Sequence, residues 1–194
     1  MEQSIQNLAL QRYAVGTLLN ISLSSVDYIL SQIKVFHVLV AVMKEHSSCI
    51  PLVHTILLLL QELLTLNQQV ALDTMTEANA DLTIMSIIKS SGKKTQHLPI
   101  ALANLSLFCN HREESRIALT TSDNIMFLVK LVKDHDRNLP VHQEAFKLLQ
   151  TLNNDDMPVP RALLKDRASV VIIRKASMVE KIKHQHMQIF ANEC

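Results

Sequence analysis

Three short motifs in the chain carry residue types that perform chemistry in enzymes. The stretch SGKKT, residues 91–95, resembles a phosphate-binding loop, but the second glycine that such a loop needs, five residues before Gly92, is replaced by Ile87. The stretch SIIK, residues 86–89, has the Ser-x-x-Lys spacing of acyl-serine enzymes without their Lys-Thr-Gly partner. The stretch HQE, residues 142–144, has the His-x-Glu of zinc deaminases, but no Pro-Cys-x-x-Cys follows. No motif is complete, so we do not expect an enzyme.

Histidine and cysteine are the other residues that could do chemistry, by holding a metal ion. The chain has no HExxH motif and no Cys/His quartet, and His184 and His186 are two positions apart, on different faces of a helix. We therefore predict no metal and no cofactor. The three cysteines, Cys49, Cys109 and Cys194, are odd in number and widely spaced, which favours reduced thiols in an intracellular protein.

The composition favours an all-α fold. Nearly half of the residues are apolar, yet none is Trp, and Gly16 and Gly92 are the only glycines in 194 residues. A β-sandwich or a doubly wound α/β fold of this length needs many more glycines in its turns.

Charge and hydropathy indicate where such a protein works. The net charge is +1, so no overall field directs the chain to nucleic acid or a membrane. The N-terminus lacks the pattern of a signal peptide, and polar residues interrupt the most apolar run, residues 50–66, which predicts a buried helix. We expect an intracellular, cytoplasmic location, with a nuclear or cytoskeleton-associated one also open.

One octet pattern occurs three times and predicts three equivalent helices. It reads LVAVMKEH at 39–46, IMSIIKSS at 84–91 and LVKLVKDH at 128–135, in steps of 45 and 44 residues. Each copy has four apolar residues at matching positions and a lysine near its end, where a cation is stabilised by the helix dipole. The lysines are Lys44, Lys89 and Lys133.

A second series predicts a longer helix in each repeat. It reads TLLNIS, ELLTLN, ALANLS and LLQTLN, anchored on Asn20, Thr65, Asn104 and Thr151 in steps of 45, 39 and 47. The last two copies carry the apolar stripes of amphipathic helices, namely Leu98, Ala101, Leu102, Leu105 and Phe108, and Val141, Ala145, Leu148, Leu149 and Leu152. A short helix is expected before each octet, at 27–32, 72–77 and 116–121, and the expected N-caps are Ser25, Asn79, Asp123 and Asn138.

Three helices in each 40–47 residues resemble the armadillo repeat. The stretches 10–22 (LQRYAVGTLLNIS) and 98–132 carry the resemblance, because a third helix in that family ends on ALxNLS before a short helix and an i..Lv.Ll helix. It covers about residues 8–154 and implies a right-handed α-solenoid of about three to four three-helix repeats with an atypical C-terminal cap. The chain departs from the family by lacking Trp and the glycine between the first two helices, so we do not expect it to read nuclear-import signals.

The expected organisation is a repeat region followed by a cap. Residues 1–156 hold the repeats, divided into a lone third helix at 8–24 and units at 25–67, 68–110 and 111–154. Residues 157–194 form a basic C-terminal capping segment, in which residues 165–176 fit a strand as well as a helix.

The resemblance implies a non-enzymatic scaffold that binds a partner peptide or helix along a concave face lined by the third helices. An exposed Asn can donate to and accept from a bound backbone amide, although Asn20 and Asn104 could instead satisfy local backbone. The polar residues expected to line this face are Arg12, Asn20, Gln61, Thr65, His97, Asn104, Gln143, Lys147 and Thr151.

Two alternative functions stay open. Apolar Leu8, Leu10, Ala14 and Leu18 of the lone helix need covering, so end faces could assemble the chain into a larger solenoid or homo-oligomer. The last segment could bind acidic protein, nucleic acid or a membrane, but its wide charge spacing favours a solvated face, so nucleic acid and membrane are not expected partners. Its basic residues are Arg161, Lys165, Arg167, Arg174, Lys175, Lys181 and Lys183.

Overall fold

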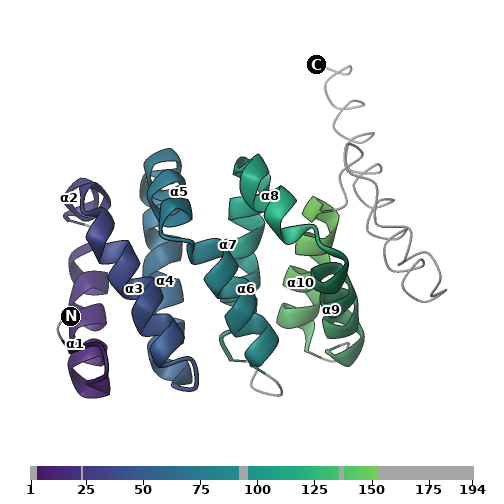
Figure 1. The fold of residues 1–194 in the computed structure, drawn as a ribbon, viewed down its shortest axis with the longest axis horizontal. Coiled ribbons are helices and arrows are strands. Elements are labelled where there is room, and N and C mark those ends of the chain that lie inside the picture. Colours follow the sequence, from purple (N-terminus) through teal and green to yellow (C-terminus); the bar gives the residue numbers. More distant parts are fainter. Residues whose placement is uncertain (1–3, 23, 92–95, 136–137, 153–194) are drawn as a thin grey trace. The chain divides into compact units, whose positions relative to one another are not determined.

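The computed structural model describes residues 4–22, 24–91, 96–135 and 138–152, and those residues form ten helices and no strand (Figure 1). The expected all-α fold is confirmed over this part of the chain. The predicted capping segment, its basic residues, Cys194, residues 92–95 of the SGKKT motif and the open choice at 165–176 lie outside the described residues. The chain divides into two compact units, residues 1–115 and 116–194.

The helices lie where the two series predict them. The first unit contains α1 (Leu8–Ser22), α2 (Val26–Ser31), α3 (Ile33–Glu45), α4 (Ile50–Leu66), α5 (Gln68–Glu77), α6 (Ala80–Ser90) and α7 (Leu98–His111). The division falls within α8 (Glu113–Leu119), and the second unit contains α9 (Ser122–Asp134) and α10 (Leu139–Leu152). The octets end α3, α6 and α9, with their lysines in the last turns.

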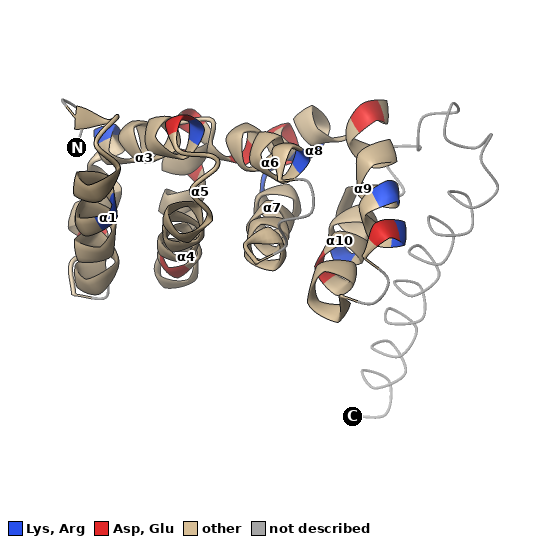
Figure 2. Cartoon of the chain, turned by 90° about the horizontal axis from the view of Figure 1, so that it is seen from below, with Lys and Arg blue, Asp and Glu red and all other residues tan. Residues whose placement is uncertain are grey.

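Helices of like position lie beside one another in the first unit. The long helix α4 packs between α1 and α7, while α3 packs beside α6 and α2 beside α5 (Figures 1 and 2). Each long helix also touches the shorter helix that precedes it, as α4 touches α3 and α7 touches α6. Consecutive groups of three helices therefore bury their apolar sides against one another.

The apolar positions of both series form the core. The twelve apolar octet positions of α3, α6 and α9 are all buried, and so are the two predicted stripes of α7 and α10. The apolar run 50–66 is α4, whose buried side chains face neighbours on several sides. The prediction of a buried helix there is confirmed.

Burial in the first unit repeats every 45 residues. Eight residues of α4 are buried, and the residue 45 positions later, in α7 or at its N-cap, is buried in every case. The α4 residues are Leu52, Val53, Ile56, Leu57, Leu59, Leu60, Leu63 and Leu64. Their counterparts are His97, the N-cap of α7, and seven residues of α7, namely Leu98, Ala101, Leu102, Asn104, Leu105, Phe108 and Cys109. The step of 39 from Thr65 to Asn104 is therefore wrong, and the counterpart of Thr65 is Asn110.

The helix starts differ from the expected caps. Ser25 and Asn79 occupy N-cap positions but make no capping side-chain hydrogen bond. Asp123 lies inside α9, and Thr121 is the N-cap instead, with its Oγ1 accepting from the Asn124 backbone N–H at 3.2 Å. Asn138 immediately precedes α10.

Asn79 lies at the turn between α5 and α6 in an unusual backbone conformation. Its φ is 59° and its ψ 38°, a left-handed conformation that Asn tolerates better than other residues with a β-carbon. The chain reverses here without a glycine because Asn supplies the same backbone geometry.

The second unit contains its own short polar links. The Asn124 Nδ2 donates to the Leu119 carbonyl at 3.0 Å, which ties α9 to the end of α8. A His142 ring nitrogen lies 3.3 Å from the Val132 carbonyl, which joins α10 to α9.

In the part of the chain that the structure describes, no helix combines the length and apolarity needed to cross a membrane.

Replacement of Asn79 tests its backbone role. We expect Asn79→Val to lower the free energy of unfolding by about 1–2 kcal/mol, since a β-branched residue resists the left-handed region. Asn79→Gly should leave it unchanged or raise it. Urea denaturation followed by circular dichroism measures both, and Asn110→Val in α7 is a control expected within about 0.5 kcal/mol of the parent. Equal losses for the two valine variants would contradict the assignment.

Candidate functional site

The side of α1, α4 and α7 that faces away from the other helices is the candidate site, and we call it the free face. Neighbours cover α4 on both flanks and, through α3 and α5, on a third side, so its exposed residues can point only to the fourth. Apart from its chain neighbours and the nearby backbone of α1 itself, nothing lies within 4 Å of where a β-carbon at Gly16 would be, so the surface of α1 is open there.

Residues on the free face recur at the 45-residue step. Tyr13, Leu58 and Ala103 form an apolar row across the three helices, with Tyr13 79% exposed and Leu58 38%. Asn20, Thr65 and Asn110 form an exposed polar row in the last turns. Between them lie Thr17, Glu62 and Leu107.

The free face carries little charge. Arg12 and Glu62 are the only Lys, Arg, Asp or Glu residues on α1, α4 and α7, and the other charged side chains lie mainly on the remaining helices (Figure 2). Recognition here would depend on apolar contact and hydrogen bonds.

The structure brings four of the nine predicted lining residues together. Arg12 and Asn20 are exposed on α1, and Thr65 is exposed and Gln61 half-buried on the adjacent α4. Arg12 lines a shallow pocket with Ala9 and Tyr13.

The prediction that His97 and Asn104 are exposed is wrong, because both are fully buried. The Asn104 Nδ2 donates to the Leu57 carbonyl at 2.9 Å, which ties α7 to α4. The His97 Nε2 lies 2.6 Å from the Ser91 Oγ and links the start of α7 to the end of α6. Both side chains hold helices together.

Three predicted lining residues belong to the second unit. Gln143 and Lys147 are exposed on α10 and Thr151 is half-buried. The Thr151 Oγ1 donates to the Lys147 carbonyl at 3.2 Å, and Lys147 pairs with Glu144 on the same helix. The polar groups of Lys147 and Thr151 therefore have partners within α10.

Asn110 is not among the residues predicted from the sequence, although the sequence carries a signal for it. Asn104 is three residues after Ala101 and four before Phe108, which places it on the stripe already predicted to be buried. Asn104 was predicted to line the face because ALANLS is similar to TLLNIS. The octet step of 45 residues instead leads from Thr65 to Asn110.

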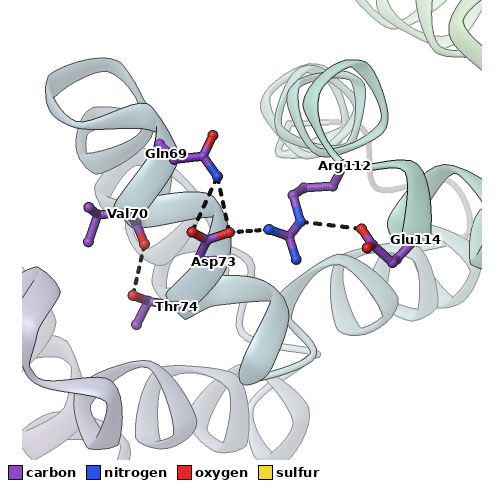
Figure 3. A network of polar contacts seen from close by, with 6 residues as sticks. All are labelled: Gln69, Val70, Asp73, Thr74, Arg112 and Glu114. Carbon is purple, nitrogen blue, oxygen red and sulfur yellow. Dashed lines mark hydrogen bonds and ion pairs between the residues drawn. The ribbon is translucent and has the colours of Figure 1, made fainter.

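A polar network that the sequence analysis did not predict connects α5 with the start of α8 (Figure 3). Arg112 pairs with Asp73, and its Nε lies 3.5 Å from a Glu114 carboxylate oxygen. Gln69 donates to both oxygens of Asp73 at 3.2 Å. Asn67, 45 residues before Arg112, bonds in the same way to Asp27 of α2 at 3.5 Å. One kind of link thus joins successive short helices.

Groups with catalytic or metal-binding chemistry are sparse in the described part of the chain. Among those residues, no cluster of three His, Cys, Asp or Glu could hold a metal ion. Ser86 and Lys89 of the SIIK motif lie exposed on α6, and HQE lies on α10. Cys49 and Cys109 form no disulfide.

Comparisons with known proteins do not assign the site. No protein-family model matches the chain, and no curated protein or solved structure is detectably similar to it.

Asn20 and Asn104, which look alike in the sequence but differ in burial, give a matched stability test. Asn104→Ala should lower the free energy of unfolding by about 1–3 kcal/mol, because it removes a buried hydrogen bond and side-chain volume. Asn20→Ala should change it by less than about 0.5 kcal/mol. Urea denaturation of both variants checks this, and similar values for the two would show that the buried bond contributes little.

A double-mutant cycle tests the link between α5 and α8. Asp73→Ala and Arg112→Ala should show a coupling of about 0.2–1 kcal/mol, since the pair is partly exposed to water. The coupling should fall in high salt. A coupling that does not respond to salt would contradict an ionic link.

Proposed function

We propose that the chain is a non-enzymatic protein-interaction scaffold that binds a segment of a partner protein across the free face. The observation that supports this proposal most is the recurrence of equivalent side chains on three adjacent helices. Tyr13, Leu58 and Ala103 offer apolar contact, while Asn20, Thr65 and Asn110 offer hydrogen bonds, and no described helix covers either row.

The spacing of the rows suits an extended segment that crosses the helices. Packed helices lie about 8–10 Å apart, and an extended or polyproline chain advances about 3.1–3.4 Å per residue. Every third residue of such a segment would therefore meet the side chain at the equivalent position of the next helix. Exposed Asn side chains can bond to the backbone of the segment, so the polar row would hold it without requiring one sequence.

The proposal includes an armadillo-like solenoid, in which successive groups of three helices stack and bury a shared core. Its support is the pairing of α1 with α4 and α7, of α3 with α6 and of α2 with α5, together with the 45-residue step in burial. A left-handed Asn79 at the turn where that family places a glycine agrees with it.

A second candidate function is assembly through an end face. Leu10 and Ile21 of α1 are 43% and 41% exposed, and Leu8 is also exposed, which leaves much of this helix uncovered. Apolar surface of this kind favours contact with another chain. Binding through the basic segment 161–194 is the remaining alternative, and its residues lie outside those described.

A peptide selected from a random library against the parent protein tests the free face. Leu58→Glu should weaken binding of that peptide at least about tenfold, because it places a charge in the apolar row. Leu82→Glu is the matched control, since Leu82 has similar exposure but lies on α6. Fluorescence anisotropy measures both affinities, and circular dichroism checks that each variant folds.

Two results would count against the proposal. One is an equal loss of affinity in Leu58→Glu and Leu82→Glu. The other is a strong dependence of the affinity on salt, because α1, α4 and α7 carry few charges.

A further inference from the structure

An apolar pocket of about 430 Å³ opens between α1 and α3, and it borders the free face at Thr17. Its lining consists of Ala14, Thr17 and Leu18 of α1 and Lys34, Val35 and Val38 of α3. The four apolar residues of this set are only half-buried, unlike the rest of the core. We call this feature the end pocket.

The 45-residue step shows what covers the same surface elsewhere in the first unit. The counterparts of Ala14, Leu18, Val35 and Val38 are Leu59, Leu63, Ala80 and Thr83, and all four are at most 3% exposed. The counterparts of Thr17 and Lys34 are Glu62 and Asn79, which keep contact with solvent. The end pocket therefore has an apolar floor and a polar rim.

The helix α3 packs against both α4 and α6, the two helices that carry these counterparts. The end pocket lies between α1 and α3, which are the counterparts of α4 and α6 one 45-residue step earlier in the chain. No described helix takes the equivalent place there. The surface that α3 covers one step later thus remains open at α1.

The orientation of α3 and its charged ends predict in which direction a helix bound in the end pocket would run. His46, just after α3, bonds to the Ile5 carbonyl just before α1, so α1 and α3 run antiparallel. Lys34 lies at one end of the exposed side of α3 and Glu45 at the other. The helices α3 and α6 run in the same direction (Figure 1), so a helix placed like α3 would begin near Lys34.

We propose that the end pocket binds an amphipathic helix of a partner protein, with an apolar face like that of α3 and acidic residues in its first turn. The apolar face would cover Ala14, Leu18, Val35 and Val38. The acidic turn would meet Lys34 and would also stabilise the N-terminus of the bound helix. A basic last turn would meet Glu45.

A second copy of this chain fits the pocket less well than such a partner. A helix placed in the end pocket like α3 runs parallel to α3, so α3 of a second copy would set its own Lys34 beside Lys34 of the first. The α3 sequence itself has no acidic residue in its first turn. The charge at the rim therefore selects a different polypeptide.

A synthetic peptide that copies α3, residues 33–45, preceded by two glutamates, is the probe. We expect the full chain to bind it, and Val38→Glu to weaken binding at least about tenfold, since the new charge lies on the apolar floor. Val70→Glu on the exposed side of α5 is the matched control and should bind like the parent. Fluorescence anisotropy of the labelled probe measures each affinity.

A charge exchange tests the rim without disturbing the floor. Lys34→Glu should weaken binding of the glutamate probe by up to about fivefold. A second probe, with two lysines in place of the glutamates, should bind the Lys34→Glu variant as tightly as the glutamate probe binds the parent. No binding of the probe to the parent, or equal binding to Val38→Glu and the parent, would overturn the proposal. So would a parent dimer in sedimentation velocity that Val38→Glu abolishes, because a second copy would then occupy the pocket.

The two proposed surfaces can be separated with the same variants. Leu58→Glu should leave the α3 probe bound, and Val38→Glu should leave the library peptide bound. If the α3 probe does not bind but the library peptide does, the end-pocket proposal is wrong and the free-face proposal stands.

Discussion

The first unit depends on the burial of α4 between helices of neighbouring groups. Its apolar side chains face α1 on one flank, α7 on the other and α3 and α5 behind, so no group of three helices completes its own core. Burial of a Leu, Ile or Val side chain contributes about 1.5–3 kcal/mol, and this term outweighs the partly exposed polar links between the helices. No described helix covers the surface of α1 that corresponds to the part of α4 covered by α3, and an apolar pocket lies there.

Polar contacts set the alignment of the helices within that core. Asn104 is buried and bonds to the Leu57 carbonyl, so a shift of α7 along α4 would leave a buried amide without its acceptor. Asn67 and Arg112, 45 residues apart, each bond to an acid on the preceding short helix. These surface links are individually weak, but they recur with the apolar period. Each one therefore favours the same alignment as the core does.

The fold was more predictable than the site. The three octets and the stripes of α7 and α10 were identified correctly, because burial requires apolar residues at helical spacing and that spacing is visible in the sequence. The lining residues were harder, because a polar residue can face solvent or bond inside the core. Asn20 and Asn104 look alike in sequence, yet one is exposed and the other is buried against a carbonyl of another helix. The exposed counterpart, Asn110, follows from the 45-residue step in burial, which the resemblance between short motifs obscured.

The sequence by itself determined the all-α class, the positions of the helices in the described part of the chain and the apolar side of each one. These properties depend on residues close together in the chain, whose spacing sets the face on which they lie. The tertiary structure decided which polar residues reach the surface, that Asn79 takes a left-handed backbone at the α5–α6 turn, and that Val35 and Val38 remain open beside α1. Those properties depend on which distant helix lies alongside, and no local pattern of residues specifies that neighbour.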